Sequence, residues 1–136
     1  MGMKQKIKKL SSSISKNFGT KNPFELCTLL GINVRFKNYN IEAMKGCYSK
    51  LDDENIFIYI NSNLSERSQE IVCAHELGHI FLHPNAGNHF NGGDIQKEFE
   101  ANLFAAYLLL NESAYDIKFE NMNSYLLQQA INDLII

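Results

Sequence analysis

The amino-acid sequence predicts an α+β fold in which a small, mostly antiparallel three-stranded sheet packs on helices. Three observations predict it. Three strand-like segments follow one another in the first half of the chain, and a polar turn joins two of them. Segments whose apolar residues recur at helical spacing lie before and after these strands. One of the later helices is apolar on almost its whole circumference, so we expect it to be buried against the sheet.

The composition is that of one soluble domain. With 136 residues the chain can bury one hydrophobic core but not two, so we expect a single domain over residues 1–136. A net charge of -2 gives no reason to expect direct binding to nucleic acid. Three cysteines without a CxxC pair, no signal-peptide pattern and no apolar run of membrane-spanning length indicate a cytoplasmic protein that stays outside the membrane.

The N-terminal region, residues 1–20, is predicted to be a helix that ends at Gly19. Its apolar residues at helical spacing are Ile7, Leu10, Ile14 and Phe18. A cluster of lysines covers its other faces, and such a cluster is usually a solvated surface. Asn22 followed by Pro23 is typical of a helix N-terminus, and Gly31 then ends this second, shorter helix.

Strands are predicted at residues 32–36, 44–49 and 56–60. The polar residues 51–55 separate the last two segments, so we expect these two strands to form a hairpin. The last segment is apolar on both faces, which is typical of a strand that is covered on both sides.

Helices dominate the second half of the chain. Ser65 is a suitable N-cap for a long helix that runs to His83, where the following proline ends it. Residues 84–95 are polar and contain three glycines, so we expect a mobile loop. A strong helix is predicted over residues 96–110 and a weaker one near residues 124–134.

The long helix contains the pattern HExxH, which is typical of zinc peptidases. His75 and His79 lie one turn apart on one face, so both rings can reach one zinc ion at about 2.0–2.1 Å. Glu76 lies beside them and can accept a proton from a metal-bound water. Gly78 costs about 1 kcal/mol relative to alanine inside a helix, which indicates that another backbone approaches closely there.

A catalytic zinc also needs a third protein ligand. His83 is about 12 Å of helical rise away from His75, so we expect a residue near the site and not a ligand. In the next helix, Glu98 can bind the metal while Asn102, one turn later, hydrogen-bonds a ligand histidine. Glu100 points roughly 200° around the helix from Glu98 and remains the second choice.

Four segments carry a resemblance to a known family: Asn22-Pro-Phe-Glu-Leu, Ile60-Asn-Ser-Asn-Leu64, Cys73-Ala-His-Glu-Leu-Gly-His-Ile-Phe-Leu-His-Pro84 and Glu98-Phe-Glu-Ala-Asn-Leu-Phe-Ala-Ala-Tyr-Leu-Leu109. Over about residues 20–112 the chain resembles the ImmA/IrrE family of metallopeptidases. The resemblance implies that the HExxH helix supplies two zinc ligands, His75 and His79, and the general base, Glu76. It also implies that Glu98 of the following helix is the third ligand.

The resemblance further implies a biological role. ImmA-like members are encoded on prophages and integrative elements and cleave the element's own helix-turn-helix repressor. Two departures from the family pattern matter. Leu110-Asn111 stands where many relatives have a proline, and we expect the chain to be without the C-terminal sensor domain of the IrrE branch. The second departure favours the compact ImmA type.

We therefore expect a zinc metalloendopeptidase with one zinc ion per chain and a helix-turn-helix repressor as its protein substrate. The strand at residues 56–61 is expected to lie at a sheet edge and to align the substrate. The donor that stabilises the oxyanion stays open among Tyr107, His83, His89 and Tyr115. Two alternative hypotheses keep the fold: a non-catalytic regulator that binds a repressor, and a toxin–antitoxin component.

Overall fold

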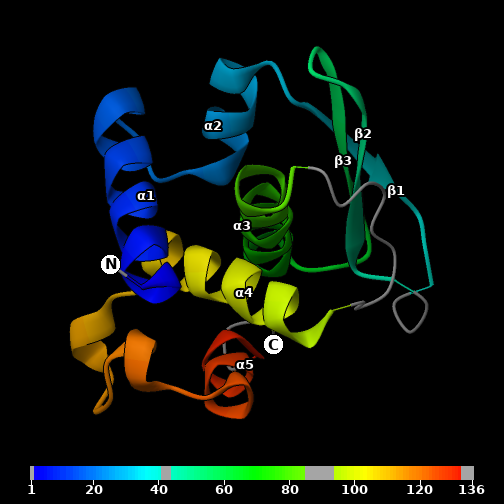
Figure 1. The fold of residues 1–136 in the computed structure, drawn as a ribbon. Helices are drawn as coiled ribbons and strands as arrows, with labels where there is room; N and C mark the ends of the chain where they lie inside the picture. Colours follow the sequence, from blue (N-terminus) through cyan, green and yellow to red (C-terminus); the bar gives the residue numbers. More distant parts are fainter. Residues whose placement is uncertain (1, 41–43, 85–93, 133–136) are drawn as a thin grey trace.

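The computed structural model describes residues 2–40, 44–84 and 94–132 (Figure 1). Its elements, in chain order, are α1 (Met3–Phe18), α2 (Pro23–Leu30), β1 (Asn33–Lys37), β2 (Gly46–Asp52), β3 (Asn55–Asn61), α3 (Glu66–Leu82), α4 (Ile95–Leu109), the short 3-10 helices η1 (Glu112–Ala114) and η2 (Phe119–Asn121), and α5 (Ser124–Asn132). No helix within the described ranges is long and apolar enough to cross a membrane. Most of the predicted mobile loop, residues 84–95, lies outside the described residues, and its last residue belongs to α4.

The helix boundaries follow the predicted capping residues. Asn22 Oδ1 accepts a hydrogen bond from the N–H of Phe24 at 2.9 Å, which fixes the start of α2. Gly31 ends that helix with a φ of 73°, a conformation that favours glycine. Ser65 caps α3 by accepting from the N–H of Ser68 at 3.2 Å. These contacts confirm the predicted helix ends. The ends could be predicted because each cap involves residues close together in the sequence.

The sheet is mixed, so the prediction of a mostly antiparallel sheet was wrong. Its strand order is β1-β3-β2. β2 and β3 form the predicted antiparallel hairpin, with Tyr48 opposite Ile58, whereas β1 runs parallel to β3 with Val34 opposite the same Ile58. β3 is the central strand. It therefore has no open edge, contrary to the expected role of residues 56–61. Ile58 and Ile60 on one of its faces are fully buried, whereas Phe57 and Tyr59 on the other face are only partly buried, so the apolar pattern overstated how far this strand is covered on both sides.

The parallel pair results from the connection between β1 and β2. The end of β1 and the start of β2 both lie beside the end of β3, because Phe36 and Gly46 each pair with Ile60. Asn61 holds the connection there, since its main-chain N–H and its side-chain amide each donate to a carbonyl of the connection at 2.9 Å. β3 then fills the space between the two earlier strands, parallel to the first and antiparallel to the second.

The centre of the molecule is α3, which lies between the sheet and α4 (Figure 1). It contacts β2 and β3 on one side and α4 on another, while α1 and α5 pack on α4. Leu77 of α3 is fully buried, as are Leu103 and Phe104 of α4. The helix that carries the HExxH pattern is therefore supported by the hydrophobic core on several sides.

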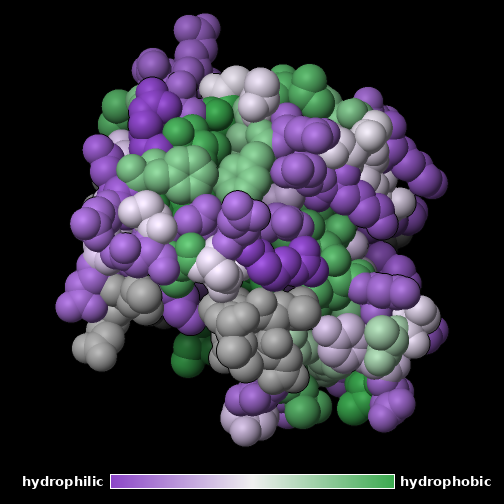
Figure 2. Space-filling view, turned by 180° about the vertical axis from the view of Figure 1, so that it is seen from behind, coloured by the Kyte–Doolittle hydropathy of each residue, from purple (hydrophilic) through white to green (hydrophobic). Residues whose placement is uncertain are grey.

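Hydrophilic and hydrophobic residues alternate over the face shown in Figure 2, without one apolar area covering it. Two lysines of the α1 cluster hold C-terminal segments. Lys4 Nζ donates to the carbonyl of Glu120 at 2.8 Å, and Lys8 Nζ lies 3.8 Å from Glu112 Oε1. Part of the lysine cluster thus makes intramolecular contacts at the surface.

Gly78 allows α3 and α4 to approach closely. A Cβ at this position would lie 3.2 Å from the carbonyl oxygen of Ala101 and 3.1 Å from Cδ1 of Phe104, both in α4. Both neighbours belong to fully buried residues, so neither can move aside easily. This contact confirms the predicted backbone approach, and it sets how near α4 comes to the histidines of α3.

The substitution Gly78→Ala is expected to destabilise the protein by about 1 kcal/mol, because overpacking of a rigid contact outweighs the gain in helix propensity. Gly78→Val is expected to cost more. Urea unfolding monitored by circular dichroism would measure both values. Gly2→Ala is the control, because no atom lies within 4 Å of an added Cβ there. An increase in stability for Gly78→Ala would contradict the role of this contact.

Candidate metal centre

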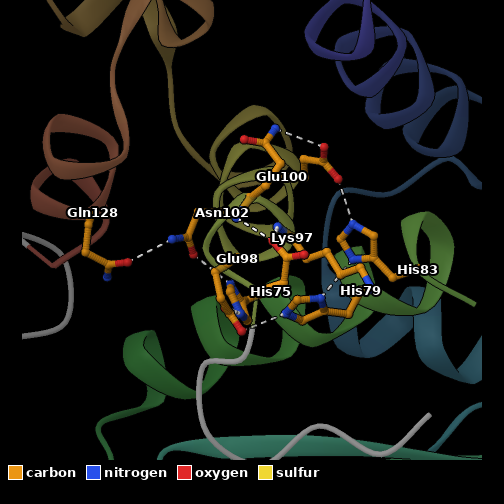
Figure 3. Close-up of polar contacts among 10 residues, drawn as sticks. His75, His79, His83, Lys97, Glu98, Glu100, Asn102 and Gln128 are labelled. Atoms are coloured by element: carbon orange, nitrogen blue, oxygen red, sulfur yellow. Dashed lines mark hydrogen bonds and ion pairs between the residues drawn. The ribbon is translucent and has the colours of Figure 1, made fainter. Parts of the chain in front are cut away.

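Two helices bring four predicted site residues together. His75, Glu76 and His79 lie on α3, and Glu98 lies in the first turn of α4. Figure 3 shows His75, His79 and Glu98 facing one another. Glu98 Oε2 is 2.8 Å from His75 Nε2, and Glu98 Oε1 is 3.3 Å from His79 Nε2. One ligand atom from each of His75, His79 and Glu98 can be chosen so that all lie within 4.8 Å of one another.

The donor set fits a zinc ion. Two imidazole nitrogens and a carboxylate oxygen are ligands that zinc takes in catalytic sites. Glu98 lies 2.8 Å from one ring nitrogen and 3.3 Å from the other, and all three ligand atoms lie within 4.8 Å of one another, so a single ion could contact each of them. Both rings direct Nε2 toward Glu98, while their Nδ1 atoms contact other residues, Asn102 for His75 and His83 for His79.

The ring of His75 is oriented by a chain of hydrogen bonds that reaches the last described helix. His75 Nδ1 lies 2.6 Å from Asn102 Oδ1, and Asn102 Nδ2 donates to Gln128 Oε1 of α5 at 2.8 Å (Figure 3). Because the Asn102 amide nitrogen is used by Gln128, its oxygen accepts the proton of His75 Nδ1. The predicted contact between Asn102 and a histidine of the pair is present, and Gln128 extends it.

The charges of the site shift the pKa values of its members in opposite directions. Burial alone raises the pKa of Glu98, but hydrogen bonds from His75 and His79 and the positive charge of those rings outweigh it and hold the pKa well below its usual range. Burial disfavours the charged ring of His75, yet its hydrogen bond to Glu98 and the two nearby carboxylates raise its pKa. Glu98 is therefore an ionised acceptor that can bind a cation.

Glu76 differs from Glu98 because it is almost completely buried. Burial raises the pKa of Glu76 to about 7; the charge of His75 opposes this rise, and the charge of Glu98 adds to it. Its Oε2 atom is buried and has no hydrogen-bond partner among the residues that the structure describes. A carboxylate whose pKa is near neutral can take up and release a proton at the pH of a cell.

Glu100, the second choice for a ligand, lies elsewhere. Its Oε1 is 2.7 Å from His83 Nε2, and its Oε2 accepts from the side chain of Gln96 at 3.1 Å. His83 in turn places its Nδ1 3.0 Å from His79 Nδ1. Glu98, and not Glu100, is thus the glutamate that faces both histidines of the HExxH pattern.

Tyr48 of β2 also contacts the site, although no sequence pattern marks it. Its buried ring stacks on His79, with centroids 5.7 Å apart and an interplanar angle of 21°. Burial raises the pKa of its hydroxyl, and the charges of Glu76 and Glu98 raise it further. Alternation in β2 assigns Tyr48 to the same face as Ile58, but only the packing of the sheet on α3 places it against a histidine.

The other residues considered for oxyanion stabilisation have different surroundings. Tyr107 and Tyr115 both pack their rings against Phe119, with centroids 5.5 and 5.2 Å away. His83 is engaged by His79 and Glu100, and His89 lies outside the described residues.

Comparisons with known proteins identify the family of the chain. A family model described as the IrrE N-terminal-like domain matches residues 27–131. The chain is 43% identical over 109 residues to "Uncharacterized immunity region protein 2" of Bacillus phage phi105, a match that covers 76% of this chain and 68% of that protein. It is 36% identical over 118 residues to "Metallopeptidase ImmA" of Bacillus subtilis (strain 168), covering 82% of this chain and 64% of that protein. The match thus spans about two thirds of the length of each relative. The chain therefore belongs to the ImmA/IrrE family of metallopeptidases.

Proposed function

We propose that this protein is a zinc-dependent endopeptidase that cleaves a regulatory protein in the cytoplasm, with the helix-turn-helix repressor of a prophage or integrative element as its substrate. The observation that carries the proposal is the convergence of His75, His79 and Glu98. These three would hold one zinc ion. The buried carboxylate of Glu76 is close enough to interact electrostatically with His75 and Glu98. A purely structural zinc site would have no use for the buried carboxylate of Glu76.

In the proposed reaction the zinc ion and the side chains of the protein would have different roles. Zinc, when bound, lowers the pKa of a water molecule and polarises the carbonyl of the scissile bond. Glu76 would take the proton of the attacking water and pass it to the leaving amine, a task for which a pKa near 7 is suitable. Asn102 would keep His75 in the tautomer that presents Nε2. Tyr48 would shield the inner side of His79 from water through its stacked ring.

The sheet suggests how an extended substrate would bind. Within the described ranges β2 pairs with β3 alone, so its outer edge can accept another strand. β2 also carries Tyr48, whose ring touches His79, so a strand added to this edge would pass close to the metal site. We therefore assign to β2 the substrate-aligning role that the sequence analysis gave to residues 56–61.

The substrate class rests on the relatives. One carries the name of a phage immunity region protein and the other that of the metallopeptidase ImmA. The family resemblance connects such proteins to cleavage of helix-turn-helix repressors. Among the described residues no specific contact favours the regulator or the toxin–antitoxin hypothesis, and the buried carboxylate of Glu76 favours an enzyme over a non-catalytic regulator.

The substitution Glu76→Gln is expected to reduce cleavage of the repressor encoded beside the gene by about 10²-fold to 10⁴-fold, because the proton acceptor is lost. Zinc content is expected to remain that of the wild type. Gel electrophoresis of timed incubations would measure the rate. Glu70→Gln is a matched control, since Glu70 also lies on α3 but pairs with Arg67 at 2.8 Å. Equal cleavage by wild type and Glu76→Gln would refute the mechanism.

Metal analysis would test the ligands directly. Purified wild-type protein is expected to contain about one zinc ion per chain, and the variants His79→Ala and Glu98→Ala are expected to contain almost none. Glu70→Ala serves as the control and is expected to keep its zinc. Full zinc content in Glu98→Ala would show that another residue is the third ligand.

A proline scan of β2 at positions 47–50 would test the substrate strand. Proline is tolerated in an edge strand where its missing N–H would have faced solvent, and it weakens the sheet where the N–H is paired. We expect at least one position at which proline leaves the melting temperature nearly unchanged but raises the KM for the repressor. If every stable proline variant cleaves with the KM of the wild type, substrate does not bind along this edge.

A further inference from the structure

We infer that His83 and Glu100 are positioning residues that hold His79 in the orientation and tautomer needed to bind the metal. The inference rests on the proposed zinc site and deepens it, because it explains how the more deeply buried histidine of the pair is oriented. The two residues come from different helices, His83 from the end of α3 and Glu100 from α4.

The contacts form one continuous chain behind His79 (Figure 3). His79 Nδ1 lies 3.0 Å from His83 Nδ1, and His83 Nε2 lies 2.7 Å from Glu100 Oε1. The other carboxylate oxygen of Glu100 accepts from Gln96 at 3.1 Å, which fixes the carboxylate in turn. The exposed fractions of His79, His83 and Glu100 are 2%, 8% and 8%, so water competes little for these contacts.

Binding of the proposed zinc ion would determine which nitrogen of each histidine in this series of hydrogen bonds carries a proton. His79 can bind zinc through Nε2 only if that nitrogen carries no proton, so its proton lies on Nδ1. His79 Nδ1–H must then donate to His83 Nδ1, which accepts and carries no proton. The remaining proton of a neutral His83 lies on Nε2 and donates to Glu100, which accepts because an ionised carboxylate has no proton to give. One arrangement of protons satisfies every contact.

The two histidines are supported differently. The chain from His75 ends in the amides of Asn102 and Gln128, which are neutral. The chain from His79 ends in a carboxylate, and hydrogen bonds to an ionised acceptor are about twice as strong as neutral ones. Glu100 therefore favours the metal-binding tautomer of His79 through His83, although it does not itself reach the Nε2 atoms that face Glu98.

Zinc affinity measured by competition with a chelator would test the inference in Glu100→Ala and Glu100→Gln. We expect about 10-fold to 100-fold weaker zinc binding for Glu100→Ala, the size typical of lost outer contacts to a metal ligand. Glu100→Gln is expected to lie between this variant and the wild type, because its oxygen can still accept from His83 while its charge is gone.

The matched control is Glu112→Gln. Glu112 is a partly buried glutamate that accepts from the N–H of Phe119 at 2.8 Å and lies near Lys8, away from the metal site. Its loss is expected to lower the melting temperature without changing zinc affinity. If the Glu100 variants lower only the melting temperature and bind zinc as tightly as the wild type, Glu100 merely joins the two helices and the inference is wrong.

A measurement on the wild type does not depend on the folding of any variant. Nitrogen-15 NMR of the zinc-loaded protein distinguishes the two imidazole tautomers. We expect the proton of His79 on Nδ1 and that of His83 on Nε2; a proton on Nδ1 of His83 would overturn the inference alone. A wild-type protein that binds no zinc would instead overturn the proposed function, and this inference with it.

Discussion

The contact between α3 and α4 at Gly78 is the constraint on which the rest of the site depends. Neither helix alone supplies all three ligand candidates, because the two histidines lie on α3 and the facing carboxylate lies on α4. Without a Cβ at Gly78, the helices approach until the carbonyl of Ala101 limits them. At that spacing Glu98 reaches the rings of both histidines. The sheet packs against another side of α3 and so helps to hold α3 close to α4.

The fold could be predicted from the sequence where its signals are local. The caps at Asn22 and Ser65 depend on residues within three positions, and the hairpin depends on a short polar turn. The strand order could not be predicted in this way. It depends on Asn61 binding the connection between β1 and β2, a contact between residues distant in sequence that leaves no periodic pattern. The result is a central β3 where the sequence analysis expected an edge.

The site residues, too, could be predicted only where their positions depend on local sequence spacing. The spacing of the HExxH pattern placed two rings and a carboxylate together, and the geometry of the next helix favoured Glu98 over Glu100. Tyr48 and Gln128 were not found, because they reach the site from β2 and α5 through tertiary packing alone. His83 was expected near the site and not as a ligand, and its contacts with His79 and Glu100 could not be predicted without knowing how the helices cross.

The hydrogen bonds from His75 through Asn102 to Gln128 couple the orientation of His75 to the folding of α5. α5 is a nine-residue helix that packs on α4, and short elements with few packing contacts open more often than core helices do. When α5 opens, Asn102 loses the partner that decides which of its amide atoms faces the histidine. The free energy of opening α5 thereby becomes part of the free energy of ordering His75, although α5 contributes no ligand of its own.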